Sequence, residues 1–121
     1  MNPVSYLKAR RTINLLAIAV WMGVIFFGSS IPQKEMPPAF NPVSKLGHVV
    51  EYAVLGFLIF PLTSGRGRPI LYAVLLSTAY AATDEFHQLF TPGRHGSPLD
   101  VLIDSFGSTV GSYLAVRWSR R

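Results

Sequence analysis

The chain contains no cysteine, so no disulfide framework, thiol nucleophile or thiolate metal site can form within it. Its redox compartment therefore cannot be inferred from cysteine usage. Charged residues are also scarce, at 14% of the 121 positions against 50% for hydrophobic residues. Together with a positive mean hydropathy, this composition predicts a single small domain, residues 1–121, that is rich in apolar helix.

Several motifs of soluble-protein function are missing as well. The net charge of +5 comes without a basic helix or a basic patch interleaved with aromatic residues, so nucleic acid is not an expected partner. No H-E-x-x-H or G-x-S-x-G motif occurs, so we predict neither a dense metal site nor a nucleophile elbow. Imidazole and carboxylate ligands still suit several divalent ions, and the sequence leaves the cofactor unknown.

Four apolar windows are present instead, and each is close to the roughly 20 helical residues that cross a hydrocarbon layer. They are residues 12–31, 46–63, 69–90 and 98–116. The first contains no charge and is apolar on every side, which argues against an amphipathic helix of a soluble globule. It also exceeds the apolar core of a cleaved signal peptide, which reaches about 15 residues. We therefore predict an all-α integral membrane bundle of four transmembrane helices.

Basic residues are distributed unevenly between the two sides of such a bundle. Eight of the eleven lie near the N-terminus, in the connection at residues 64–68 or near the C-terminus. The other three, Lys34, Lys45 and Arg94, belong to the opposite side. This positive-inside bias predicts that both termini are cytoplasmic and that the two longer polar connections face outward.

Most acidic side chains and all the histidines gather at the outer ends of these predicted helices. Five of the six acidic residues and all three histidines belong to this set, although a charge at mid-membrane costs about 2.5–3.5 kcal/mol on insertion scales. Separations of three and four residues place most members on one face of each helix. The set consists of Lys45, His48, Glu51, Tyr52, Asp84, Glu85, His87, Gln88, Arg94, His95, Asp100 and Asp104.

Gly107 and Gly111 follow Asp104 at a spacing of four residues in the last window. Small residues at this spacing let membrane helices approach closely, and Ser108 and Ser112 lie beside them. We predict that this surface is a helix-packing seam that holds the acidic side chains of the window against the other helices.

Three motifs follow one another in order within residues 31–114. They are Lys45-x-x-His48-x-x-Glu51-Tyr52, Asp84-Glu85-x-x-Gln88-x-Phe90-x-Pro92-Gly93-Arg94, and Asp100-x-x-x-Asp104-x-x-Gly107-x-x-x-Gly111. In this order they resemble the VanZ-like family, small multi-span bacterial membrane proteins named after a teicoplanin-resistance protein. The resemblance implies a protein of the bacterial inner membrane and cell envelope, with an influence on sensitivity to glycopeptide or lipopeptide antibiotics. One position departs from the family pattern, because Asp104 stands where that pattern usually has Asn.

The polar set contains an excess of acidic groups. Its carboxylates can supply five negative charges, whereas Lys45 and Arg94 supply two positive ones. Unpaired buried carboxylates are untenable, so some must be protonated, or a cationic group or metal must enter. A carboxylate beside His48, either Glu51 or Asp84, could fix the imidazole tautomer and make an acid/base pair.

Two classes of function fit this set. In the first, an outward-facing pocket binds the head of a membrane lipid or other amphiphile, with Lys45 and Arg94 attracting phosphate or carboxylate. In the second, the protein is a small intramembrane hydrolase or transferase that acts on an envelope lipid, with His48, Glu85 and Asp84 as catalytic residues. The expected ligand-binding residues are Lys45, His48, Glu51, Tyr52, Asp84, Glu85, Gln88, Arg94, Asp100 and Asp104.

A purely structural interpretation also stays open, in which the charged residues form an ion-pair knot that locks short helices together. A proton path is less favoured, because no titratable residue is apparent in the inner half of the predicted helices. The sequence does not decide between a monomer and a homo-oligomer.

Overall fold

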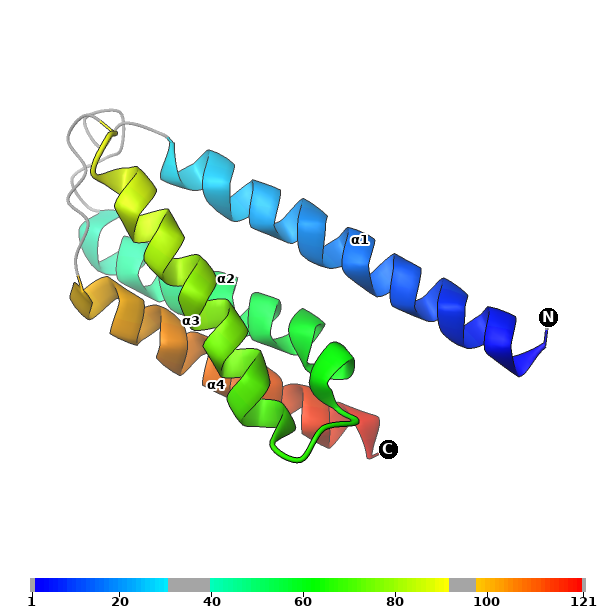
Figure 1. Ribbon diagram of the computed structural model, residues 1–121. Helices are drawn as coiled ribbons and strands as arrows, with labels where there is room; N and C mark the ends of the chain where they lie inside the picture. The colour runs from blue at the N-terminus through cyan, green and yellow to red at the C-terminus, as the bar shows by residue number, and fades with distance from the viewer. Residues whose placement is uncertain (1, 31–39, 92–97, 121) are drawn as a thin grey trace.

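The computed structural model describes residues 2–30, 40–91 and 98–120, with only the backbone described for residues 40–44. These residues form four α-helices, which confirms the expected all-α class (Figure 1). In chain order they are α1 (Pro3–Ser29), α2 (Phe40–Thr63), α3 (Pro69–Gln88) and α4 (Pro98–Ser119).

A side-chain cap and prolines mark where the helices begin. At the start of α1, the Asn2 side chain accepts a hydrogen bond from the Ser5 amide at 2.8 Å, and Pro3 occupies the first turn. This cap makes α1 begin well before the predicted residue 12, so the basic residues at 8–11 lie inside the helix. Pro69 and Pro98 begin α3 and α4, where the missing amide hydrogen of proline costs nothing.

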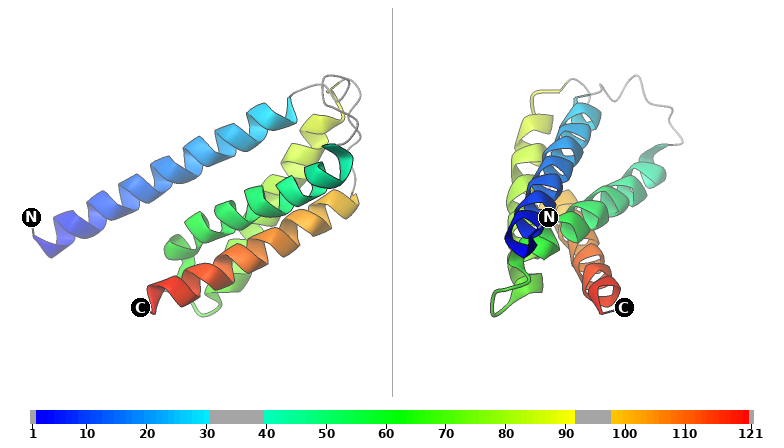
Figure 2. Two further views of the ribbon diagram at one scale, coloured as in Figure 1. Left: turned by 180° about the vertical axis from the view of Figure 1, so that it is seen from behind. Right: turned by 90° about the vertical axis from the view of Figure 1, so that its right-hand side faces the viewer.

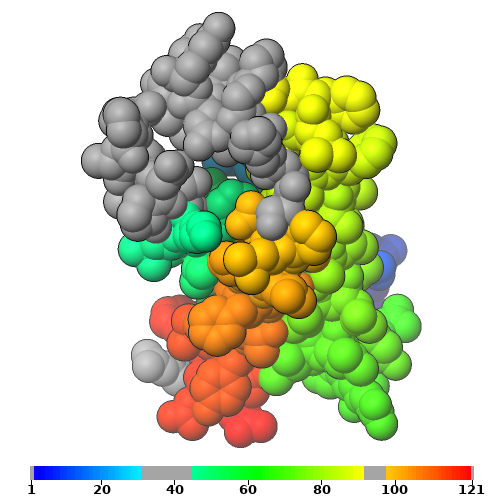
Figure 3. Space-filling model, turned by 90° about the vertical axis from the view of Figure 1, so that its left-hand side faces the viewer, coloured from blue at the N-terminus to red at the C-terminus, as the bar shows by residue number. Residues whose placement is uncertain are grey.

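Helices α2, α3 and α4 pack closely together, and α1 lies to one side of them. Packing is most extensive between α2 and α4, α3 lies against both, and α1 has its contacts with α2 and α3 (Figures 1 and 2). Figure 3 shows one face of the molecule, where α4 fills the space between α2 and α3.

Both chain termini lie at one end of the bundle, beside the short α2–α3 turn (Figure 1). The last turn of α1, the first turn of α2, the last turn of α3 and the first turn of α4 lie at the other end, which we call the polar end. The members of the predicted polar set that the structure describes lie between the polar end and the middle of α2, α3 and α4.

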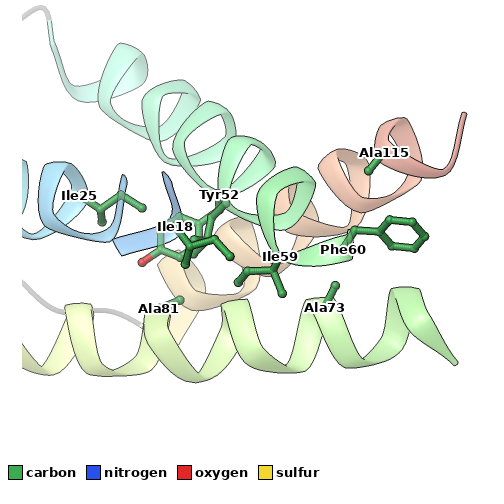
Figure 4. Close-up of a cluster of buried hydrophobic side chains, with 9 residues drawn as sticks. Ile18, Ile25, Tyr52, Ile59, Phe60, Ala73, Ala81 and Ala115 are labelled. Carbon is green, nitrogen blue, oxygen red and sulfur yellow. The ribbon is translucent and has the colours of Figure 1, made fainter. Parts of the chain in front are cut away.

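The core is small and uses alanine as well as larger apolar residues (Figure 4). Its α3 and α4 members are alanines, which leave room for neighbouring helices to approach. The buried apolar residues are Ile18, Ile25, Tyr52, Leu55, Ile59, Phe60, Ala73, Ala81 and Ala115.

Many large apolar side chains point outward rather than into this core. Phe27 of α1 is 74% exposed, and Leu102 and Phe106 of α4 are similarly uncovered. Two helical segments, Pro3–Ser29 and Lys45–Thr63, are long and apolar enough to cross a membrane. Outward apolar faces of this kind are typical of helices in lipid, because a protein in water rarely leaves large contiguous apolar surface uncovered.

Helices α2 and α4 approach each other where both carry glycine. A Cβ added to Gly111 would lie 2.5 Å from the Ala53 carbonyl carbon and 2.8 Å from its Cα. A Cβ added to Gly107 would lie 3.0 Å from the Cα of Val49, and one on Gly56 would overlap the backbone of Ser108. Only glycine fits at these positions, and the backbones of α2 and α4 lie side by side along them. We call Gly56, Gly107 and Gly111 the glycine seam.

Candidate functional site

Three helices bring a histidine and two carboxylates together near the polar end. The Nδ1 atom of His48 in α2 lies 2.9 Å from the Oδ1 atom of Asp104 in α4. Glu85 of α3 joins them, and one nitrogen or oxygen from each residue lies within 4.8 Å of the others. We call these three residues the histidine–carboxylate group.

The glycine seam explains how this group forms. Gly107 is three residues after Asp104 and lies against the backbone of Val49, which follows His48 directly. Because glycine lets the two helices approach this closely, the short Asp104 side chain can reach the imidazole ring. Asp104 has an exposed fraction of 0%, whereas the His48 side chain keeps 12% of its surface open.

A second polar group lies between α1 and α3. The Ser29 hydroxyl donates a hydrogen bond to Oδ1 of Asp84. The Gln88 amide makes long hydrogen bonds of 3.4 Å to both of these side chains. The Thr91 hydroxyl donates to the Ser29 carbonyl at 3.4 Å. We call these four residues the serine–aspartate group.

The serine–aspartate group includes a residue that the sequence analysis did not name. Ser29, the last residue of α1, is a direct partner of Asp84. The sequence contains a signal for it, because Ile18, Met22, Ile25 and Ser29 follow one another at steps of four, three and four. That spacing marks one helix face, and Ile18, Ile25 and Ser29 on it are buried.

Tyr52 lies in the core close to both groups. Its ring extends from α2 between α1 and α3, and its hydroxyl is turned away from Phe60 toward the polar end (Figure 4). Asp84 and Asp104 both lie close enough to interact electrostatically with this hydroxyl. Within the described part of the chain, the Tyr52 hydroxyl and Oδ2 of Asp104 are fully buried and have no hydrogen-bond partner.

Two side-chain hydrogen bonds attach α1 to α2 and α3 beside the site. The Trp21 indole donates a hydrogen bond to the Glu51 carbonyl of α2 at 2.8 Å. The Tyr80 hydroxyl of α3 donates to the Met22 carbonyl at 2.6 Å. These bonds join side chains to backbone carbonyls of neighbouring helices, so they set where Ser29 lies relative to Asp84. Neither tryptophan nor tyrosine was identified for this role from the sequence.

The other predicted site residues lie around these groups. Lys45 is exposed at the polar end, and Glu51 and Asp100 are partly buried. His87 stacks on Phe26 with ring centroids 4.3 Å apart, and its Nε2 lies 3.0 Å from the Ser30 hydroxyl.

The predicted partner of His48 differs from the observed one, and two other predicted site residues are not described by the structure. The structure pairs His48 with Asp104 rather than with Glu51 or Asp84, because the glycine seam brings α4 against α2 at this level. The predictions for Arg94 and His95 fall outside the described residues.

Two surface hollows lie at the opposite end of the bundle. One of about 520 Å³ is lined by residues that include Arg10, Arg11 and Arg66, and one of about 660 Å³ includes Arg68 and Arg120. Neither borders the histidine–carboxylate group. At the polar end the described side chains are buried between helices, and an open outward-facing pocket there stays a prediction.

Comparison with known proteins addresses the resemblance noted in the sequence. A family model described as VanZ/LLP1 matches residues 13–119, which confirms that resemblance over nearly the whole chain. No curated protein and no solved structure matches the chain.

Proposed function

Because the chain belongs to the VanZ/LLP1 family, we propose that it is a bacterial inner-membrane protein in which all four helices cross the bilayer. Two helical segments are apolar enough to span on composition alone. The other two, α3 and α4, have 20 and 22 residues. At 1.5 Å per residue they reach about 30 Å, the thickness of a hydrocarbon core. The basic residues favour cytoplasmic termini and an outward-facing polar end.

The polar end, in this proposal, binds the polar head of a lipid or other amphiphile of the cell envelope. The observation that carries it is the pair of buried polar atoms without a partner among the described residues, the Tyr52 hydroxyl and Oδ2 of Asp104. A buried polar group without a hydrogen bond costs about 1–3 kcal/mol, so two of them favour a ligand or bound water that supplies the missing bonds.

The chemistry of the surrounding side chains limits which heads fit. Carboxylates of Asp84 and Asp104 accept hydrogen bonds, which suits hydroxyl and amine groups of a ligand. Lys45 at the exposed edge suits phosphate or carboxylate, and Arg94 is proposed for the same role from the sequence. The head we propose therefore carries both kinds of group, such as a phosphate with a sugar or an amine.

Binding can be tested with the full chain in detergent by native mass spectrometry. The probes are phospholipids with ethanolamine, glycerol or sugar-bearing phosphate heads. Gln88→Ala should weaken retention of the preferred lipid at least threefold, because it removes a buried amide from the serine–aspartate group. Leu89→Ala is the matched control, since the neighbouring side chain is 59% exposed and apolar. Equal retention by wild type and both variants would refute the head-group site and favour a structural ion-pair knot.

In cells, we propose that this site influences sensitivity to glycopeptide and lipopeptide antibiotics. The family membership supports such a role, and the teicoplanin connection belongs to the protein that gave the family its name. Minimal inhibitory concentrations of teicoplanin should differ between cells that express the chain and cells that express Gln88→Ala at equal membrane abundance. Identical values would remove the antibiotic role while leaving lipid binding to the mass-spectrometric test.

A second candidate is an intramembrane hydrolase or transferase, and the His48–Asp104 contact favours it specifically. A carboxylate at 2.9 Å from Nδ1 fixes the imidazole tautomer and leaves Nε2 to take a proton from water or a hydroxyl. Purified protein incubated with the same lipids separates the two candidates. Product that accumulates with wild type and not with His48→Gln supports an enzyme, whereas retention without turnover supports binding alone.

A further inference from the structure

We infer that the histidine–carboxylate group is a divalent metal site, with His48, Glu85 and Asp104 as its protein ligands. One imidazole nitrogen and two carboxylate oxygens form a donor set that suits Zn²⁺ or Mn²⁺. The sequence analysis predicted no dense metal site and named no ligand set, because the three residues belong to three helices and no dense ligand motif is present.

The distances between possible donor atoms are close to those around a single ion. A metal bonded at about 2.0–2.2 Å holds neighbouring ligand atoms about 3 Å apart and opposite ones about 4.4 Å apart. The 2.9 Å between Nδ1 of His48 and Oδ1 of Asp104 matches neighbouring ligands. One possible donor atom from each of the three residues lies within 4.8 Å of the others, so a side-chain rotation has to bring Glu85 closer when an ion binds.

A second observation indicates a ligand at the same position. Within the described residues, Oδ2 of Asp104 and the hydroxyl of Tyr52 are both buried without a partner. Tyr52 follows His48 by one helical turn, and its hydroxyl is turned toward the polar end (Figure 4). A hydroxyl placed there can donate to a ligating carboxylate, the kind of outer contact that orients metal ligands.

Charge balance is compatible with the metal. A neutral imidazole and two carboxylates carry two negative charges, which a divalent ion cancels, and balanced charge is less costly next to a membrane. The same ion would let an acid-rich site accept an anionic head group, but the metal site does not depend on the proposed lipid ligand.

The metal can be measured directly, without any lipid, on the purified full chain in detergent. After treatment with EDTA, the protein is titrated with MnCl₂ or ZnCl₂ and its metal content is determined by mass spectrometry after gel filtration. We expect one tightly held ion per chain and release of protons on binding, because the ion replaces the proton shared by His48 and Asp104. Affinity should therefore rise with pH. Metal content no higher than that of the detergent blank would overturn the inference.

Variants test the ligand assignment. Asp104→Ala, Glu85→Gln and His48→Gln should each lower Mn²⁺ affinity by well over tenfold, and Tyr52→Phe by about 10–100-fold, the usual cost of losing an outer-shell partner. Thr83→Ala is the matched control. It removes an exposed hydroxyl two residues before Glu85 on α3, and affinity should change less than threefold. An equal loss in Thr83→Ala would mean that the variants act through the fold and would contradict the ligand assignment.

A measurement on wild-type protein guards against variants that fail to assemble. Pulsed electron paramagnetic resonance of bound Mn²⁺ should show nitrogen coupling from one histidine, and its absence would overturn the role of His48. The metal experiment and the lipid experiment can fail independently. Protein that binds Mn²⁺ but no lipid refutes only the head-group proposal. Protein that binds lipid but takes up no Mn²⁺ when it is titrated after EDTA treatment refutes only the metal site.

Discussion

Replacing Gly111 by alanine should force α2 and α4 apart. The added Cβ would overlap the Ala53 carbonyl oxygen and lie 2.5 Å from the carbonyl carbon, and ordinary van der Waals contact begins at 3.4 Å. The atoms in the way belong to the backbone, so no side-chain rotation relieves the overlap. The helices must therefore separate by at least about 1 Å at this point, because a close-packed interior has no free space to absorb a methyl group.

The energetic cost follows from this separation. Overpacking of a well-packed interior typically costs about 1–3 kcal/mol. A gap of 0.5–1 Å also forfeits about a quarter to a half of the dispersion attraction between the facing atoms. We expect Gly111→Ala to lower the free energy of unfolding by about 1–3 kcal/mol. Asp104 is seven residues away on the same helix, so its 2.9 Å contact with His48 should lengthen and weaken as well.

Unfolding can be followed by steric trapping or by titration with sodium dodecyl sulfate in mixed micelles. Gly23→Ala is the matched control, because a Cβ at Gly23 meets nothing within 4 Å. Alanine is a better helix former than glycine, so the control should be neutral or slightly stabilising. Stability of Gly111→Ala equal to that of Gly23→Ala would refute the close approach of α2 and α4.

Two further predictions concern α1 and the topology. Tyr80→Phe should lower stability by about 0.5–1.5 kcal/mol in the same unfolding assay, because it removes the 2.6 Å hydrogen bond to the Met22 carbonyl. Tyr72→Phe, at an exposed position, should leave stability unchanged, and equal losses would contradict this attachment of α1. Since the chain has no cysteine, single cysteines at Ser64 and Lys45 can be labelled with a membrane-impermeant maleimide in intact spheroplasts. Labelling at Lys45 but not at Ser64 is expected, and the reverse would invert the proposed orientation.

The four helices could be predicted from the sequence because their signals are local. Apolar windows of about 20 residues, and prolines at positions such as Pro69 and Pro98, act within one segment of chain. The ends were less certain, since α1 begins at Pro3 with the help of Asn2. In the sequence, the basic residues at 8–11 resemble a polar flank of the apolar window, whereas in the structure the cap at Asn2 lies before them and they are helical.

The candidate site was predictable only as a set of residues on helix faces. Spacings of three and four residues grouped His48 with Tyr52 and Asp84 with Gln88, because helical periodicity fixes which side chains share a face. Periodicity gives no information about how one helix is rotated against another. Asp104 as the partner of His48, and Ser29 as the partner of Asp84, therefore emerged only from the packed structure.

By itself, then, the sequence determined four apolar helices, an acid-rich polar end and membership of a membrane-protein family. The tertiary structure decided which of the acids meet the histidine and which buried polar atoms keep unused hydrogen-bonding capacity. The physical reason is the close approach at Gly107 and Gly111, because it sets the rotation and depth of α4 against α2. Side-chain pairs across that contact depend on tenths of an ångström, which no spacing within a single helix encodes.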